Sequence, residues 1–316
     1  MGVRLNKEPE LKNPVMLCGW AGIGNVGLVA INTMRRLVRA EEFGEIQPYE
    51  FFEPSRVIIR NGLIEELRFP GTKFYSYHGA DRDLVFLAGE QQPAEAEKAY
   101  EMAGMVLDVA EQLGCRRVYT TAASVTMIHH TAKPRVWAVP NSRDLIPEIR
   151  HYSNTVLMSA ATQPPATGEK TDSRGGTAAG APSGEGTITG LNGLLLGVAK
   201  YRQIEAICLM GEVPYYLQGA PWPYAKASIS VLEVLGRVLN VPLDLSELKD
   251  MAEKVEANIE QILDALAADE DLPDQVRIEM ERLKNPKHTQ AGPITEAEKK
   301  EILDHIDELF KSEDRQ

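Results

Sequence analysis

The stretch from residue 14 to residue 39 restricts the possible folds of this chain more than any other segment. The apolar run PVMLCGW is typical of a buried strand, and a helical pattern follows from Ile23 to Arg39. The turn between them, residues 22–27, reads GIGNVG and so spells G-x-G-x-x-G. A buried strand joined to a helix in this way is typical of an α/β protein, in which helices cover a sheet.

The same spelling occurs in dinucleotide-binding folds, so a nucleotide is one possible ligand of this turn. Such a fold needs an acidic residue near the end of the second strand, and this chain offers only the late candidates Glu50 and Glu53. It also needs a crossover helix next. Residues 56–67 (RVIIRNGLIEEL) instead form two β-rich runs joined by Asn61-Gly62, the strongest short hairpin signal.

The sequence therefore favours a packing role for the glycines. Gly22 and Gly24 permit a tight turn, and Gly27 lets the helix approach the sheet closely. Anion binding at the helix start, around Gly22, Gly24 and Asn25, remains the alternative, because backbone N–H groups are free there.

Strand and helix patterns alternate along the rest of the first 243 residues. Strands are expected at 73–77, 83–90, 116–124, 135–140, 155–160 and 204–212, with an extended stretch at 45–52. Helices are expected at 93–113, 188–201 and 225–239. Residues 161–187 contain no Leu, Ile, Val, Phe, Tyr or Trp, so we expect a mobile loop or insertion there, with a lid over a site as the alternative.

The character of the chain changes at Asp244. The pattern becomes all-helical, and one helix face is expected to carry Leu248, Met251, Val255, Ile259, Ile262 and Leu266. This segment holds 21 acidic and 10 basic residues, which is most of the net charge of −12. We therefore predict an α/β core at 1–243 and an acidic helical C-terminal extension at 244–316, which adds solubility or meets a basic partner.

Composition excludes several classes of partner. The body of the chain is almost neutral, so it offers no basic stripe for nucleic acid. No run approaches the roughly 18 apolar residues that a membrane span needs, and the N-terminal residues lack the apolar core of a signal peptide. Cys18, Cys115 and Cys208 are far apart and read as buried free thiols in a reducing compartment. A cytoplasmic protein is expected.

Two expected strands end alike, in Gly89-Glu90 and Gly211-Glu212. If both run parallel to the first strand, Glu90 and Glu212 share one sheet edge with the glycine turn and with Ser124, and such a carboxylate pair could perform acid/base chemistry or hold a metal. The alternative, which the sequence favours, is that each glutamate caps a helix or faces solvent. No histidine, serine or cysteine completes a catalytic or metal-binding pattern. We expect no catalytic residue, no metal site and no cofactor.

The order of several motifs is more distinctive than any one of them. GWAGIGNVGLVAINTM, LAGEQQPAEAEKAYEMAGMVLDVAEQLGCRRVYTTAA, ITGLNGLLLGVAK and LMGEVPYYLQGAPWPYAKASISVLEVLGRVLNVPLDLSELKDMAE follow one another over roughly residues 14–255. In this order the chain resembles the proteasome assembly chaperone 2 family. The resemblance implies a three-layer αβα, phosphorylase-like core with a mixed sheet, and a homo-oligomer. Some prokaryotic members are labelled ATP-grasp enzymes, but this sequence has no phosphate-clamping loop or carboxylate cluster in ATP-grasp order.

The resemblance implies a non-catalytic, assembly-chaperone-like or protein-interaction role. Archaeal relatives that dock on proteasome α-rings resemble one another in ending hydrophobic-Tyr-any residue, whereas the sequence here ends Ser-Glu-Asp-Arg-Gln, which places docking by that route in doubt. The phosphorylase-like core supports the alternative of a nucleoside- or phosphate-type binding protein or enzyme, which would use Gly22, Gly24, Asn25, Glu90 and Glu212.

Overall fold

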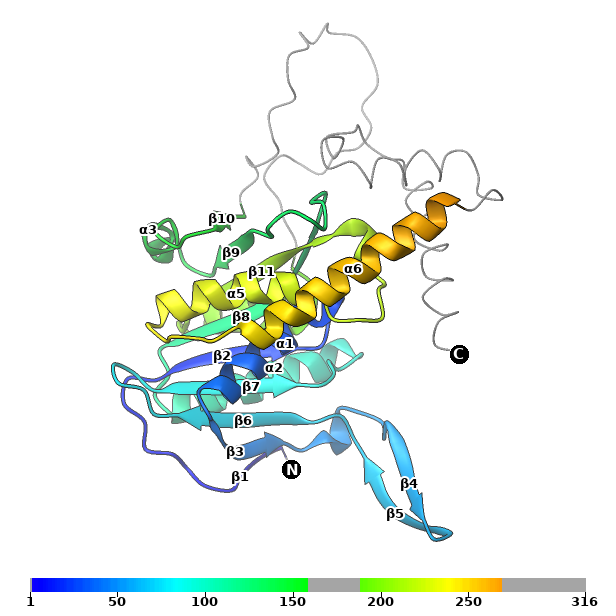
Figure 1. Cartoon of the computed structure of the whole chain (residues 1–316). Helices are drawn as coiled ribbons and strands as arrows, with labels where there is room; N and C mark the ends of the chain where they lie inside the picture. Colours follow the sequence, from blue (N-terminus) through cyan, green and yellow to red (C-terminus); the bar gives the residue numbers. More distant parts are fainter. Residues whose placement is uncertain (1, 159–187, 269–316) are drawn as a thin grey trace, which may run out of the picture.

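A computed structural model describes residues 2–158 and 188–268 of the chain. A nine-stranded sheet lies between two layers of helices (Figure 1), with strand order β1-β3-β6-β7-β2-β8-β11-β9-β10. Its strands are β1 (Val3–Leu5), β2 (Val15–Trp20), β3 (Glu41–Ile46), β6 (Thr72–Tyr77), β7 (Leu84–Gly89), β8 (Arg117–Thr126), β9 (Val136–Pro140), β10 (Thr155–Leu157) and β11 (Glu205–Pro214). The predicted three-layer α/β core with a mixed sheet is confirmed. The expected loop at 161–187 and the end of the C-terminal extension lie outside the described residues.

The centre of the sheet is parallel and its two sides are antiparallel. Strands β7, β2, β8 and β11 run parallel to one another, while β6 and β9 flank them antiparallel. Every residue of β2 and β7 is buried. Strands covered on both faces need apolar side chains on both, which is why their sequences are continuous apolar runs without alternation.

Helices cover both faces of this sheet and form two cores. One core contains buried residues of α1 (Val26–Leu37), α5 (Ala225–Val238) and α6 (Ser246–Ala268), and the other contains those of α2 (Ala96–Gln112) and α4 (Gly190–Tyr201). A short helix, α3 (Ile146–Ile149), lies between β9 and β10. Neighbouring residues of β2 face opposite cores, Leu17 the first and Met16 and Cys18 the second, as the side-chain alternation of a strand requires.

The hairpin predicted at Asn61-Gly62 is confirmed, but it stands apart from the sheet. Strands β4 (Arg56–Arg60) and β5 (Leu63–Arg68) pair only with each other and project from the body of the molecule (Figure 1). Asn61 and Gly62 both have positive φ, 53° and 80°. A two-residue hairpin turn with positive φ at both positions matches the twist of the strands that it joins.

Two local expectations were wrong, and one element was missed. Strand β3 begins earlier than expected, at Glu41, and ends at Ile46, because Pro48 cannot donate to a strand ladder and begins a 3-10 turn instead. Strand β1 was not expected, since three residues are too few to show a pattern. Met251 is 44% exposed, because Ala252 occupies that side of α6 in its place. The buried face of the helix is Leu248, Ala252, Val255, Ile259 and Leu263.

Candidate functional site

The glycine turn connects β2 to α1 and is held by the start of α5. Gly24 and Asn25 both adopt left-handed backbone conformations, with φ of 55° and 47°. Glycine adopts this region without strain, and asparagine tolerates it better than most residues. The Tyr224 N–H donates to the Gly24 carbonyl at 2.8 Å, and a Cβ placed on Gly24 would lie 3.0 Å from the Tyr224 Cβ. The turn is therefore packed against another part of the chain.

Gly27 sets the distance between α1 and the sheet. A Cβ at this position would lie 2.1 Å from the Thr121 carbonyl oxygen of β8, which no packing allows. The Thr121 hydroxyl lies 3.0 Å from the Cys18 carbonyl oxygen and 3.1 Å from that of Gly27. This geometry matches the close helix-to-sheet approach that the sequence indicated for Gly27.

Gln92 lies beside the outer part of the turn. Its amide nitrogen donates to the Ala21 carbonyl at 2.8 Å, and its amide oxygen accepts from the Leu191 N–H at 2.9 Å, near the start of α4. Gly22 is exposed, and only this side chain, at 3.8 Å, comes within 4 Å of where its Cβ would be. The end of β2, the loop after β7 and the start of α4 therefore meet around Gln92.

Glu212 is fully buried and makes four contacts to two residues. Its carboxylate accepts from the Arg135 backbone N–H at 2.8 Å, from the Arg135 guanidinium at 2.9 Å and 3.2 Å, and from the Trp137 indole N–H at 3.0 Å. The contact with Glu212 raises the pKa of Arg135. Glu212 thus neither faces solvent nor caps a helix: it fixes β9 and the loop before it to β11.

Glu90 is exposed and has a different neighbourhood. Its carboxylate accepts from the Gly71 N–H at 2.9 Å, and its own N–H donates to the Gly71 carbonyl at 2.8 Å. Strands β2 and β8 lie between the two glutamate-bearing strands, a backbone separation of about 14 Å at the usual strand spacing. The candidate residues share one edge of the sheet, but each glutamate has its own partners, and the structure does not join them to the glycine turn.

A buried polar cluster that the sequence did not predict lies where α6 meets the body. His130, in the loop after β8, is 1% exposed, and its Nε2 lies 2.8 Å from Glu260 Oε1 of α6. The Tyr216 hydroxyl lies 2.9 Å from the His130 backbone nitrogen and 2.8 Å from its Nδ1. Lys226 donates to the His130 carbonyl at 2.7 Å and to Glu256 at 2.8 Å. The cluster therefore ties α6 to three other segments.

The hydrogen bonds of this cluster assign the His130 tautomer. The Tyr216 oxygen accepts from the backbone N–H, so its own proton is free to donate to Nδ1, which leaves the ring proton on Nε2 facing Glu260. Burial lowers the pKa of His130, and this effect exceeds the opposing influence of Glu260. The ring of His129 stacks at 4.2 Å between centroids and also opposes a charge. The imidazole is therefore neutral at pH 7.

The cysteines are inert. Cys18, Cys115 and Cys208 are free and buried, as the sequence predicted. Burial raises the pKa of Cys115 and Cys208 to about 12 and that of Cys18 well above its usual value, so none is an activated thiolate. Within residues 2–158 and 188–268, no three His, Cys, Asp or Glu side chains gather as metal ligands would.

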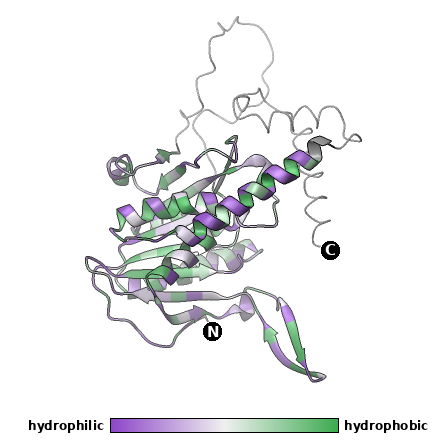
Figure 2. Cartoon of the chain, in the orientation of Figure 1, coloured by the Kyte–Doolittle hydropathy of each residue, from purple (hydrophilic) through white to green (hydrophobic). Residues whose placement is uncertain are grey.

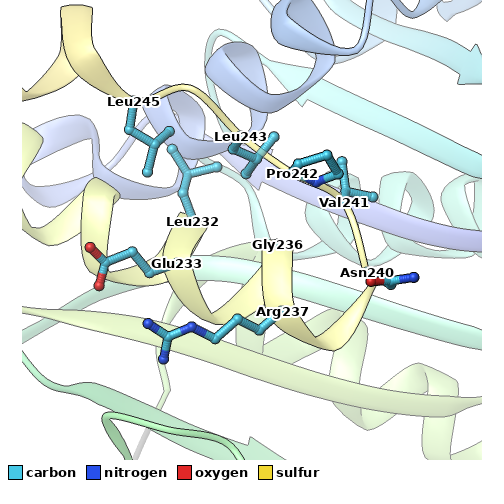
Figure 3. A pocket seen from close by; sticks show the side chains of 9 residues that line it. All are labelled: Leu232, Glu233, Gly236, Arg237, Asn240, Val241, Pro242, Leu243 and Leu245. Atoms are coloured by element: carbon cyan, nitrogen blue, oxygen red, sulfur yellow. The ribbon is translucent and has the colours of Figure 1, made fainter.

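A hollow of about 470 Å³ lies under the connection from α5 to α6 (Figure 3). It is at the end of α5 remote from the glycine turn. Its polar lining residues have partners elsewhere: Glu233 binds Lys133, Arg237 contacts Ser153, and Asn240 donates to Asp81. The hollow therefore resembles a packing gap lined by aliphatic side chains, such as Leu232 and Leu243, more than a site for a polar ligand.

The fold is that of a three-layer α/β protein. Its buried polar residues, such as Glu212 and His130, connect its own strands and helices to one another. The profile of the PAC2 family matches residues 16–263, and the chain belongs to that family. An uncharacterized protein of Methanocaldococcus jannaschii is 26% identical over 257 residues, which are 81% of this chain and 84% of that protein.

Two solved structures extend the comparison. Pyrococcus furiosus PbaB, described as an archaeal proteasome activator, is 26% identical with a TM-score of 0.63, over 82% of this chain and 97% of that one. Pyrococcus furiosus PbaA, described as an archaeal homolog of proteasome-assembly chaperone, is 19% identical with a TM-score of 0.57, over 82% and 96%. The second likeness concerns the fold alone. These findings give the ATP-grasp label no support.

Proposed function

We propose that this protein is a non-catalytic, assembly-chaperone-like protein that binds other proteins in the cytoplasm and acts as a homo-oligomer. The similarity to PbaB over most of both chains carries the proposal. A second observation supports it: the groups that a catalytic reading would use are engaged in structure. Glu212 is enclosed by Arg135 and Trp137, and the cysteines are buried. No helix among the described residues has the length and apolarity to cross a bilayer.

An affinity experiment in the source organism tests this function. The full chain carrying a tag at either end is captured from lysate after mild cross-linking, and its complexes are separated by size before mass spectrometry. The expected result is at least one other protein in fixed stoichiometry with the bait at both tag positions. Recovery of the chain alone, in both orientations and at low salt, would contradict the proposal.

One observation favours a second function, the binding of a nucleoside or a phosphate-type small molecule. Gly22 is exposed next to the start of α1, at the carboxyl ends of parallel strands, where α/β folds commonly hold ligands. A thermal-shift screen with nucleosides, nucleotides and inorganic phosphate tests it. A ligand at this edge should raise the melting temperature of the native chain, and Gly22→Val, which places a side chain at the exposed part of the turn, should weaken the shift. The absence of any shift over the panel would dismiss this alternative.

A further inference from the structure

The projecting hairpin has two chemically different faces. Cross-strand partners share a face, as do alternate residues of one strand. Val57 pairs with Leu67 and Ile59 pairs with Ile64, so these four apolar side chains lie together. The register shifts after Ile58, which makes Glu65 an extra residue in β5 and keeps Ile64 on the apolar face. In Figure 2, green stretches on both strands of this arm alternate with purple ones.

The opposite face is mostly charged. Arg56 pairs with Arg68, Ile58 with Glu66, and Arg60 with Leu63. An ion pair of 3.1 Å joins Arg60 and Glu65 at the turn end. Apart from the bulge residue Glu65, whose carboxylate pairs with Arg60, the charged side chains of the two strands therefore lie on this opposite face.

Nothing among the described residues covers the apolar face. Val57, Ile59, Ile64 and Leu67 are 47%, 65%, 72% and 53% exposed. An isolated two-stranded hairpin is at best marginally stable in water, and one with such a face gains stability by packing it away. The exposed area of the four residues is roughly 400 Å², close to the apolar share, about 57% of about 800 Å² per partner, of a standard interface.

We propose that this face packs against the same face of a second copy of the chain, as a two-fold contact between two hairpins. The inference rests on the homo-oligomer in the proposed function and names its surface. A two-fold axis through the arm brings Ile59 and Ile64 against their own copies, and every charged side chain of the strands except Glu65 faces away from the contact. Two sheets packed in this way bury both apolar faces.

The charge of the arm is compatible with a contact between two copies of the chain. The whole chain carries −12, whereas the strands of the hairpin carry three arginines and two glutamates. Two copies of the chain, each of net charge −12, repel each other, and the strands of the arm add no net negative charge to this repulsion. The strand β5 is six residues long, so the arm reaches about 20 Å. This distance keeps the two bodies apart, which reduces but does not remove the repulsion between two chains of −12.

Sedimentation velocity over a concentration series of the purified full chain tests the contact. Ile64→Lys places a charge on the apolar face, and Leu63→Lys is its matched control, since Leu63 is adjacent, 73% exposed and on the opposite face. The native chain is expected to associate. Ile64→Lys should raise the concentration of half-association at least tenfold and Leu63→Lys less than twofold, with unchanged circular dichroism and melting temperature. A native chain that stays monomeric throughout, or equal effects of the two variants, would overturn the proposal.

Cysteine cross-linking provides a second test of the contact, which remains valid if the lysine of Ile64→Lys unfolds the hairpin. The native thiols are buried. A disulfide between two chains therefore forms only where the introduced cysteine meets its own copy. Ile59→Cys should form a disulfide-linked dimer on mild oxidation, and Leu63→Cys should not. Equal cross-linking of both would contradict a contact through the apolar face.

The same variants separate this inference from the proposed function. If Ile64→Lys dissociates the oligomer but still captures the partner proteins, both proposals stand and use different surfaces. If it dissociates the oligomer and no partner is ever captured, the self-contact stands and the proposed function fails. If it associates like the native chain but loses a captured protein, the hairpin binds that protein and the self-contact is wrong.

Discussion

At the scale of single residues, the glycine turn can be tested for packing by two alanine substitutions. Gly27→Ala forces a Cβ to within 2.1 Å of a β8 carbonyl oxygen, and overpacking of this kind costs about 3 kcal/mol or more. Gly22 has an extended backbone, and its Cβ would meet only Gln92 Nε2 at 3.8 Å. Gly22→Ala should therefore change the free energy of unfolding by less than about 0.5 kcal/mol. Chemical denaturation of both variants measures the difference, and equal losses would contradict the packing role.

Substitution of the two glutamates should likewise have unequal effects on the free energy of unfolding. Glu212→Gln replaces a buried carboxylate by an amide, whose NH₂ group cannot accept from the Arg135 guanidinium or the Trp137 indole. Because the Arg135 side chain is 56% exposed, the cost is that of buried hydrogen-bonding groups left without an acceptor, about 1–3 kcal/mol. Glu90 is exposed, so Glu90→Gln should cost less than about 0.5 kcal/mol. Thermal melting at pH 7 compares them. A Glu212→Gln variant as stable as the native chain would show that the carboxylate has no structural role.

At the scale of elements, the attachment of α6 should depend on pH through His130. Burial places the folded-state pKa of this imidazole below the unfolded value of 6.5. The unfolded chain therefore binds the proton more readily, and the free energy of unfolding falls as pH decreases from about 6.5 through the folded pKa. The groups facing the ring are His129, Tyr216, Glu256 and Glu260, with Lys226 on its carbonyl.

The variant His130→Gln keeps a donor toward Glu260 but does not titrate. Between pH 7.5 and pH 5 the native chain should lose more stability than this variant, so that their melting curves converge or cross in acid. All other titrating groups are common to both proteins, and their contribution cancels in the comparison. Parallel losses of stability in the two proteins would show that His130 does not govern the acid response.

Element prediction succeeded where the signal is local. The Asn61-Gly62 turn and the apolar runs of β2 and β7 each carry their own pattern within a few residues. The His130 cluster has no such pattern, because its residues are 86 and 130 positions apart in the chain. Glu212 was noticed for its place at the end of an expected strand, but its partner Arg135 lies just before β9, which runs antiparallel beside β11. That neighbour relation depends on the whole sheet order, which the sequence alone does not reveal.

At the scale of the whole molecule, the order of the strands in the sheet keeps apart residues that the sequence motifs placed in one candidate site. Strands β7, β2 and β11 run parallel toward one edge of the sheet, yet β2 and β8 stand between the glutamates. The same topology leaves the hairpin outside the sheet, because β3 pairs with β6 directly. The exposed apolar face of the β4–β5 hairpin is therefore the feature that distinguishes the surface of this protein.

The net charge and the apolar arm together predict how self-association responds to salt. Repulsion between two chains of −12 weakens as added salt shortens the Debye length from about 10 Å at 0.1 M to about 4 Å at 0.5 M. Burial of apolar side chains on the arm is not screened. The association constant of the native chain should therefore rise severalfold between 0.1 M and 0.5 M sodium chloride. Leu63→Lys should follow the same trend, and sedimentation equilibrium measures both. A constant that falls with salt would mean that opposite charges, rather than the apolar face of the hairpin, hold the copies together.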